Sequence, residues 1–140
     1  MNSIAAAAVF VWLGMVLAIS FMEAPLKFRA PGVTIPIGLG IGRLVFRALN
    51  AAEVVLAVVV IAAVATGAPG VAVAVLTAVA SIVLVTQLAV VRPSLNRRSD
   101  RVLAGEDPAR HRSRAHLYYV ALEVVKVLSL LALGWVLQAV

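Results

Sequence analysis

The sequence predicts an all-α fold, a bundle of four helices that spans a membrane as a single domain over residues 1–140. The chain is 64% hydrophobic and only 13% charged, and a soluble domain of this size cannot hide so much apolar surface from water. Apolar stretches near the length of about 20 residues that crosses a bilayer are separated by short polar or proline-containing breaks. We place the four helices at about residues 3–22, 36–66, 71–91 and 108–139.

The first expected span, residues 3–22, contains no charged residue. It lacks the basic start and the cleavage pattern of a secretory signal peptide, so we expect it to be a retained helix. The break that follows, residues 23–32, contains Pro25 and a Pro-Gly turn signal and is expected to be a loop. Pro36 suits the first turn of the next helix.

Residues 54–91 contain no charge and are too many for one span. The sequence Thr-Gly-Ala-Pro-Gly at residues 66–70 supplies the turn that divides them into two helices. A second loop is expected over residues 92–113, which are rich in arginine. Asp107 and Pro108 then have the pattern of an N-cap followed by proline, which starts the fourth helix outside the apolar span.

Basic residues are concentrated in two segments, and this predicts the orientation. Eleven of the twelve Lys and Arg residues lie at 27–47 and 92–114. These segments join the first helix to the second and the third to the fourth, so they share one side of the membrane. The positive-inside rule places that side in the cytoplasm and both termini outside. Because arginine, alanine and valine are abundant, we expect a multi-pass protein of a bacterial plasma membrane.

Charged residues inside the expected spans are the first candidates for a functional site. Glu53 lies roughly 10 Å below the cytoplasmic interface on the second helix. Glu123 and Lys126 lie at a comparable depth, one turn apart on one face of the fourth helix. A charge in the bilayer interior costs at least about 2.5–3.5 kcal/mol, so we expect these residues to face one another. Asn50, on the same polar stripe as Glu53, is included in the predicted intramembrane cluster.

Two interpretations of this cluster stay open. In the first, Glu53 and Glu123 carry ions or protons, and the protein serves transport or permeability of a small molecule or ion, with linkage to protons as one form of it. In the second, Lys126 pairs with both carboxylates as a structural latch, and the protein is a non-catalytic membrane subunit or an assembly or scaffold protein. A lipid-interacting enzyme is a third class. The sequence shows no catalytic triad or phosphate-binding loop, so we expect no enzyme.

The basic segments form a second candidate site. We expect contacts with anionic lipid headgroups from five arginines, namely Arg43, Arg47, Arg97, Arg98 and Arg101. Membrane lipids are therefore the expected partners, together with a second copy of the chain or another membrane protein, and nucleic acid is not. No metal or cofactor is expected, because the chain has no cysteine and His111 and His116 lack a further set of ligands.

A short internal echo links the two halves of the chain. Residues 51–55 and 121–125 match in four of five positions, 70 residues apart. Pro25 and Pro93 each follow an apolar segment and precede basic residues. A parallel repeat of two plus two helices would place Glu53 and Glu123 at similar depth. Matches of alanine and valine arise easily by chance in this composition, so only the glutamates support the repeat.

Three short motifs in residues 10–60 give a family resemblance. They are Trp12-Leu13-Gly14, Ala24-Pro25-x-x-Phe28, and Gly42-x-x-Val45-Phe46 followed by Glu53. The set resembles a domain-of-unknown-function family of small four-helix membrane proteins, to which the human transmembrane protein associated with cisplatin tolerance is related. The first two motifs are more loosely similar to the copper-resistance D family. The resemblance implies a four-helix membrane bundle and no established chemistry. A copper role is disfavoured, because cysteine is absent and no Met or His pair has ligand spacing.

Overall fold

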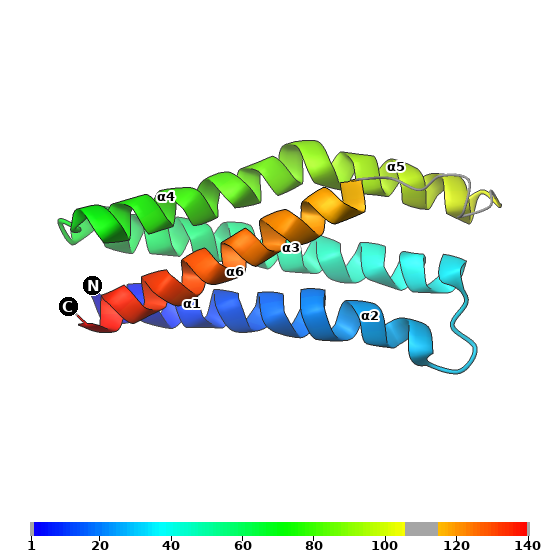
Figure 1. Cartoon of the computed structure of the whole chain (residues 1–140), viewed down its shortest axis with the longest axis horizontal. Coiled ribbons are helices and arrows are strands. Elements are labelled where there is room, and N and C mark those ends of the chain that lie inside the picture. Colours follow the sequence, from blue (N-terminus) through cyan, green and yellow to red (C-terminus); the bar gives the residue numbers. More distant parts are fainter. Residues whose placement is uncertain (1, 106–114, 140) are drawn as a thin grey trace.

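The computed structural model describes residues 2–105 and 115–139 and is a bundle of four long helices (Figure 1). The first helix is continuous through α1 (Asn2–Val16), η1 (Leu17–Glu23), α2 (Ala24–Leu26) and η2 (Lys27–Arg29), and the second is α3 (Ile35–Thr66). The third runs through α4 (Val71–Thr86), η3 (Gln87–Val91) and α5 (Arg92–Leu103), and the fourth is α6 (Ala115–Ala139). The described residues contain no strand, so the predicted all-α four-helix fold is confirmed.

All four helices are long and apolar enough to span a membrane. Their outward side chains are largely apolar, and Leu44, Val71 and Trp135 are 71%, 81% and 75% exposed. Charged side chains such as Glu53 and Lys126 are instead fully buried. An apolar outside and a partly polar inside suit lipid surroundings rather than water. The chain is therefore a multi-pass membrane protein.

The helices form a ring in which α1 packs against α3 and α6, and α4 packs against α3 and α6. Both termini and the turn at residues 67–70 lie at one end of the bundle (Figure 1). The connection at residues 30–34 and the end of α5 lie at the other. We refer to the half near the termini as the terminal half. The half that contains η2, the start of α3 and α5 is the basic half.

Pro25 and Pro93 lie inside continuous helices, so the helix ends and loops predicted around them are wrong. Proline lacks an N–H and clashes with the carbonyl four residues earlier, which belongs to Phe21 for Pro25 and to Ala89 for Pro93. Both carbonyls lie in π-helical segments, η1 and η3. A wider turn of this kind accommodates proline in membrane helices. Residues 92–103, predicted to be part of a loop, therefore form the helix α5, and the rest of the predicted loop from residue 106 lies outside the described residues.

The second helix and the turn after it agree with the sequence. Thr34 is the N-cap of α3, and its side chain accepts a hydrogen bond from the backbone N–H of Ile37 at 3.3 Å. Pro36 lies in the first turn, where a missing N–H costs nothing. Residues 67–70 then lead into α4. The start predicted for the fourth helix at Pro108 lies outside the described residues.

Two glycines one turn apart bring the end of the first helix close to α3. A Cβ atom on Gly38 would overlap the ring of Phe28, and one on Gly42 would lie 2.8 Å from the Lys27 Nζ. The G-x-x-x-G spacing of α3 therefore makes room for η2, as small residues commonly do between membrane helices. This contact positions Lys27 and Phe28 at the basic half of the bundle.

The terminal half has a closely packed apolar core. Small and branched side chains from α1, α3, α4 and α6 meet there, and Val9, Leu130 and Leu133 are completely buried. The core extends from Ala5 and Leu137, near the chain termini, inward along all four helices. It stops at the middle of the bundle, where charged side chains replace apolar ones.

Candidate functional site

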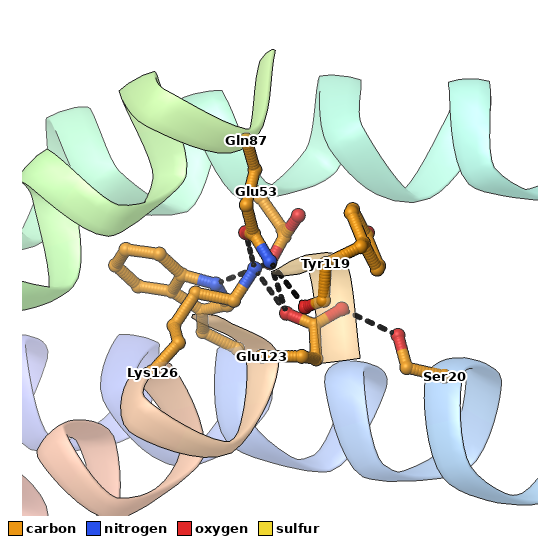
Figure 2. A network of polar contacts seen from close by, with 7 residues as sticks. Ser20, Glu53, Gln87, Tyr119, Glu123 and Lys126 are labelled. Carbon is orange, nitrogen blue, oxygen red and sulfur yellow. Dashed lines mark hydrogen bonds and ion pairs between the residues drawn. The ribbon is translucent and has the colours of Figure 1, made fainter. Parts of the chain in front are cut away.

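A buried lysine on α6 joins charged and polar side chains in the middle of the bundle (Figure 2). The Lys126 Nζ forms ion pairs with Glu53 on α3 and with Glu123 Oε1, the latter at 2.6 Å. It also donates a hydrogen bond to Gln87 Oε1 at 2.8 Å. An ammonium group has three N–H donors and no acceptor, so these contacts use all of them. The three charged side chains are at most 1% exposed.

Two residues of the first helix bind the carboxylates. The indole Nε1 of Trp12 donates to Glu53 Oε1 at 3.0 Å, and the Ser20 hydroxyl donates to Glu123 Oε2 at 2.7 Å. The Nε2 of Gln87 donates to Glu123 Oε1 at 3.3 Å. All four helices thus contribute to what we term the buried network, which consists of Trp12, Ser20, Glu53, Gln87, Glu123 and Lys126.

The two carboxylates of the buried network are not equivalent. Glu123 has a donor on each oxygen, whereas Glu53 Oε2 is buried and has no hydrogen-bond partner among the described residues. Two carboxylates and one ammonium carry a net charge of −1 when all three groups are ionised, which is costly away from water. One bound proton neutralises the network. Glu53 Oε2 suits this proton, because no neighbouring N–H or O–H group of the described residues donates a hydrogen bond to it.

The π-helical segments place two members of the buried network. Ser20 lies in η1 and Gln87 lies in η3. Such segments are rare, appear mostly as single turns inside α-helices, and are frequent at functional sites. Pro25 and Pro93 are accommodated by these same segments. The prolines, which sequence reasoning assigned to loops, therefore help to position the hydrogen-bonding groups on the first and third helices.

The structure brings together the three charged residues predicted to face one another, Glu53, Glu123 and Lys126. It separates Asn50 from them. Asn50 is 8% exposed, but it lines a groove next to the third helix and forms no hydrogen bond with the buried network in the described part of the chain. Asn50 and Glu53 lie about 60° apart around α3, and this offset turns the amide toward a different neighbour.

Three members of the buried network were not predicted as site residues. Trp12 was noted only as part of a family motif, and Ser20 and Gln87 were not singled out. The available signal was position, because an indole N–H or an amide in the middle of an apolar span needs a partner inside the protein. Ser20 gave no such signal, since a hydroxyl group is often satisfied by its own helix.

The five arginines predicted at headgroup level, Arg43, Arg47, Arg97, Arg98 and Arg101, lie on α3 and α5 in the basic half. All are exposed or partly exposed. Arg43 forms an ion pair with Asp100 that joins these two helices. Because α5 is helical, Arg97 and Arg101 are one turn apart on the same face. Their contact with lipid headgroups stays a prediction.

Two cavities occupy the basic half. The first, of about 430 Å³, lies between all four helices, and its wall includes Lys27, Arg43, Arg92 and Arg98 together with several aromatic rings. We term it the basic cavity. Ser20 belongs to its wall and also binds Glu123, so the cavity borders the buried network. The second, of about 690 Å³, is lined only by α3 and the third helix. It lies between two neighbouring helices of the ring, and we term it the lateral groove.

No protein-family model, curated protein or solved structure matches this chain. The family resemblance of the sequence motifs stays a prediction. The residues that carry it nevertheless gather in space. Trp12 donates a hydrogen bond to Glu53, and Pro25, Phe28 and Phe46 all line the basic cavity.

Proposed function

We propose that this membrane protein serves transport or permeability of a small molecule or ion, and that the buried network couples the movement to a proton. One observation carries the proposal, namely the mismatch between two buried carboxylates and one ammonium, with Glu53 Oε2 left without a partner among the described residues. Ionisable groups inside a membrane are costly to keep, and they commonly mark ion or proton pathways.

The basic cavity supports this proposal because it gives the buried network a route toward one side of the membrane. Ser20 binds Glu123, and the backbone carbonyl of Tyr119 accepts a hydrogen bond from Gln87 at 3.4 Å. Both Ser20 and Tyr119 line the cavity. Toward the other side, the apolar core of the terminal half fills the interior. This arrangement suits a conformation that is open at the basic half only, and transport requires a second conformation in which the terminal half opens.

In this proposal the basic half faces the cytoplasm of a bacterial plasma membrane and both termini lie outside. The concentration of arginine in the basic half supports this orientation. Reporter fusions after Gly67 and at the C-terminus are expected to report an extracytoplasmic location, and a fusion at Ser99 a cytoplasmic one. A C-terminal reporter that is active in the cytoplasm would contradict the orientation.

Infrared spectroscopy of the purified protein tests where the proton resides. We expect a carboxylic acid C=O band in the wild type that disappears in Glu53→Gln. The band should persist in Glu23→Gln, a control that removes a carboxyl group from the first helix outside the buried network. It should also shift after transfer into D₂O, because a coupled proton must exchange with the solvent. Absence of a band assigned to Glu53, or a proton that does not exchange in the folded protein, would contradict the proposal.

A second function is favoured by a different observation. All three N–H donors of Lys126 are bonded to buried acceptors, as expected of a latch that fixes the helix register in a non-catalytic subunit or assembly protein. Purification from native membranes distinguishes the two functions. A protein partner in fixed stoichiometry, together with a Glu53→Gln variant that loses its fold, supports the subunit. A bound small molecule, with a folded but inactive Glu53→Gln variant, supports transport.

A further inference from the structure

Arg92, the first residue of α5, holds its guanidinium group inside the bundle between two aromatic rings. Its Cζ lies 4.8 Å from the ring centroid of Phe46 and 4.6 Å from that of Tyr119. The two rings meet edge to face, with their centroids 5.9 Å apart. Aromatic faces attract a guanidinium and fix its plane, but they supply no negative charge. The rings therefore orient the group but form no ion pair with it.

The nitrogen atoms of Arg92 have unused hydrogen-bonding capacity. Nε and Nη2 are both buried and have no partner within residues 2–105 and 115–139. None of the carboxylates in this part of the chain forms an ion pair with Arg92. A buried charged donor without an acceptor is destabilising. The planar fork of arginine matches two oxygens of a phosphate or carboxylate group, so an oxyanion satisfies both its donors and its charge.

Neighbouring side chains extend this position into a binding site. Asn96 and Ser99 follow Arg92 by four and seven residues, share its face of α5, and line the basic cavity with it. Lys27 lies on the opposite wall, with its Nζ 5.6 Å from the centroid of the Phe46 ring. Glu23, at 3.6 Å, offsets the charge of Lys27 but does not line the cavity. The described residues of the wall include no acidic side chain.

The lateral groove connects this position with the outside of the bundle. Arg43, Arg92 and Asn96 line both the groove and the basic cavity, so they form a shared wall. Leu44 also lines the groove and is 71% exposed, as expected for a side chain that meets lipid. A molecule with an anionic head and an apolar body can therefore place its head at Arg92 while its body stays among the lipid chains.

We propose that Arg92 and Asn96 on this shared wall, with Ser99 beside them in the basic cavity, bind a phosphate-type oxyanion. A membrane lipid that enters through the lateral groove supplies the oxyanion, and a free phosphate ester that enters through the basic cavity has the same chemistry. This site does not depend on the proton coupling proposed above. Its tests measure ligand binding, whereas the proton coupling is tested by infrared spectroscopy, so either proposal can fail without the other.

Native mass spectrometry of the full chain in detergent tests the site with phosphatidylglycerol as the probe. We expect one retained lipid per protein, and binding at least about tenfold weaker in Arg92→Gln, the loss typical for a charge-assisted hydrogen bond. Arg29→Gln is the matched control. It removes the same charge from an exposed position in η2, at the end of the first helix, that lines neither cavity, and it should change binding less than about twofold. Equal losses of affinity in both variants would mean that the lipid binds through nonspecific attraction to surface charge, and this would overturn the proposal.

Two further ligands identify the chemical group and its source. Diacylglycerol has the same apolar body without the phosphate, and it should bind much more weakly than phosphatidylglycerol. Equal binding of the two would overturn the oxyanion assignment. Displacement of the lipid by inorganic phosphate would support the site and identify a soluble oxyanion as a second source. Lack of displacement, with phosphatidylglycerol bound, would support the lipid headgroup alone.

Two conservative variants keep the test decisive if Arg92→Gln disturbs the aromatic stack. Arg92→Lys keeps the charge but loses the planar fork, so binding should still weaken. Asn96→Leu keeps the branched shape of the side chain and every positive charge but removes the amide, so it should weaken binding several-fold while the thermal unfolding temperature stays near that of the wild type. Full affinity in both variants, with the fold intact, would overturn the proposal.

Discussion

The terminal half and the basic half of this bundle are built from the same four helices, but their interiors differ. In the terminal half, buried side chains such as Val9, Leu130 and Leu133 form a closely packed apolar core. In the basic half, the helices enclose the basic cavity, and Arg92 stands inside it between two rings. Lipid is as apolar as a packed core, so apolar contact alone specifies helix rotation weakly in a membrane. We therefore expect the buried network at the boundary to supply that specificity for both halves.

The largest effect is expected from removing the charge at this boundary. Lys126→Met leaves two buried carboxylates without their cation, and breaking a buried ion pair typically costs about 3–5 kcal/mol of unfolding free energy. Titration of the purified protein with denaturing detergent measures the loss. Glu53→Gln combined with Lys126→Met should cost less than the sum of the two single changes, because the partners interact. A Lys126→Met variant as stable as the wild type would show that the halves pack correctly without the buried network.

An intermediate effect should separate the two halves directly. Leu133→Ala removes a side chain that is 0% exposed in the terminal half and leaves a void. We expect the free energy of unfolding to fall by about 2 kcal/mol. This is at the low end for such changes, because unfolding in an apolar medium transfers the side chain to lipid or detergent and not to water. Leu95→Ala makes the same change at the wall of the basic cavity, where the side chain is only partly buried, and should cost much less. Equal losses, measured by the same titration, would mean that the basic half is packed as tightly as the terminal half.

The smallest effect is expected at the surface of the basic half. The ion pair between Arg43 and Asp100 joins α3 to α5, but its side chains are 38% and 57% exposed. Exposed pairs contribute at most about 1 kcal/mol and are screened by salt. Asp100→Asn should therefore lower the thermal unfolding temperature only slightly, and the difference should vanish at high salt. A large loss that persists in salt would show that α5 depends on this pair for its position.

The sequence predictions were accurate where a feature depends on neighbouring residues in the chain, and inaccurate where it depends on contacts with other helices. Pro36 and the turn predicted at residues 66–70 were interpreted correctly because helix starts and tight turns depend on neighbours in the chain. Pro25 and Pro93 misled because the rule that proline ends a helix omits the compensation that a π-helical turn provides. That compensation depends on the surrounding helices and has no clear mark in a single sequence.

The residues of the site also divide into those that the sequence could predict and those that it could not. Glu53, Glu123 and Lys126 could be grouped from energy alone, because an unpaired charge is too costly anywhere in the membrane. The polar partners on the first and third helices could not, because the spans around Trp12 and Gln87 carry no charge that fixes their rotation. The cavities depend on how far the four helices separate at the basic half, which composition and periodicity do not encode.

One extra residue in η3 decides which way the charges of α5 face. A π-helical turn carries one more residue than the α-helix it interrupts, and one residue corresponds to about 100° of rotation. Deleting Ala89 would let the third helix run as a regular α-helix and would turn everything after it by that angle. Arg92 would then leave its place between Phe46 and Tyr119 and face another direction. The interior charge of the basic half thus depends on the residue count between Gln87 and Pro93 as much as on the arginine itself.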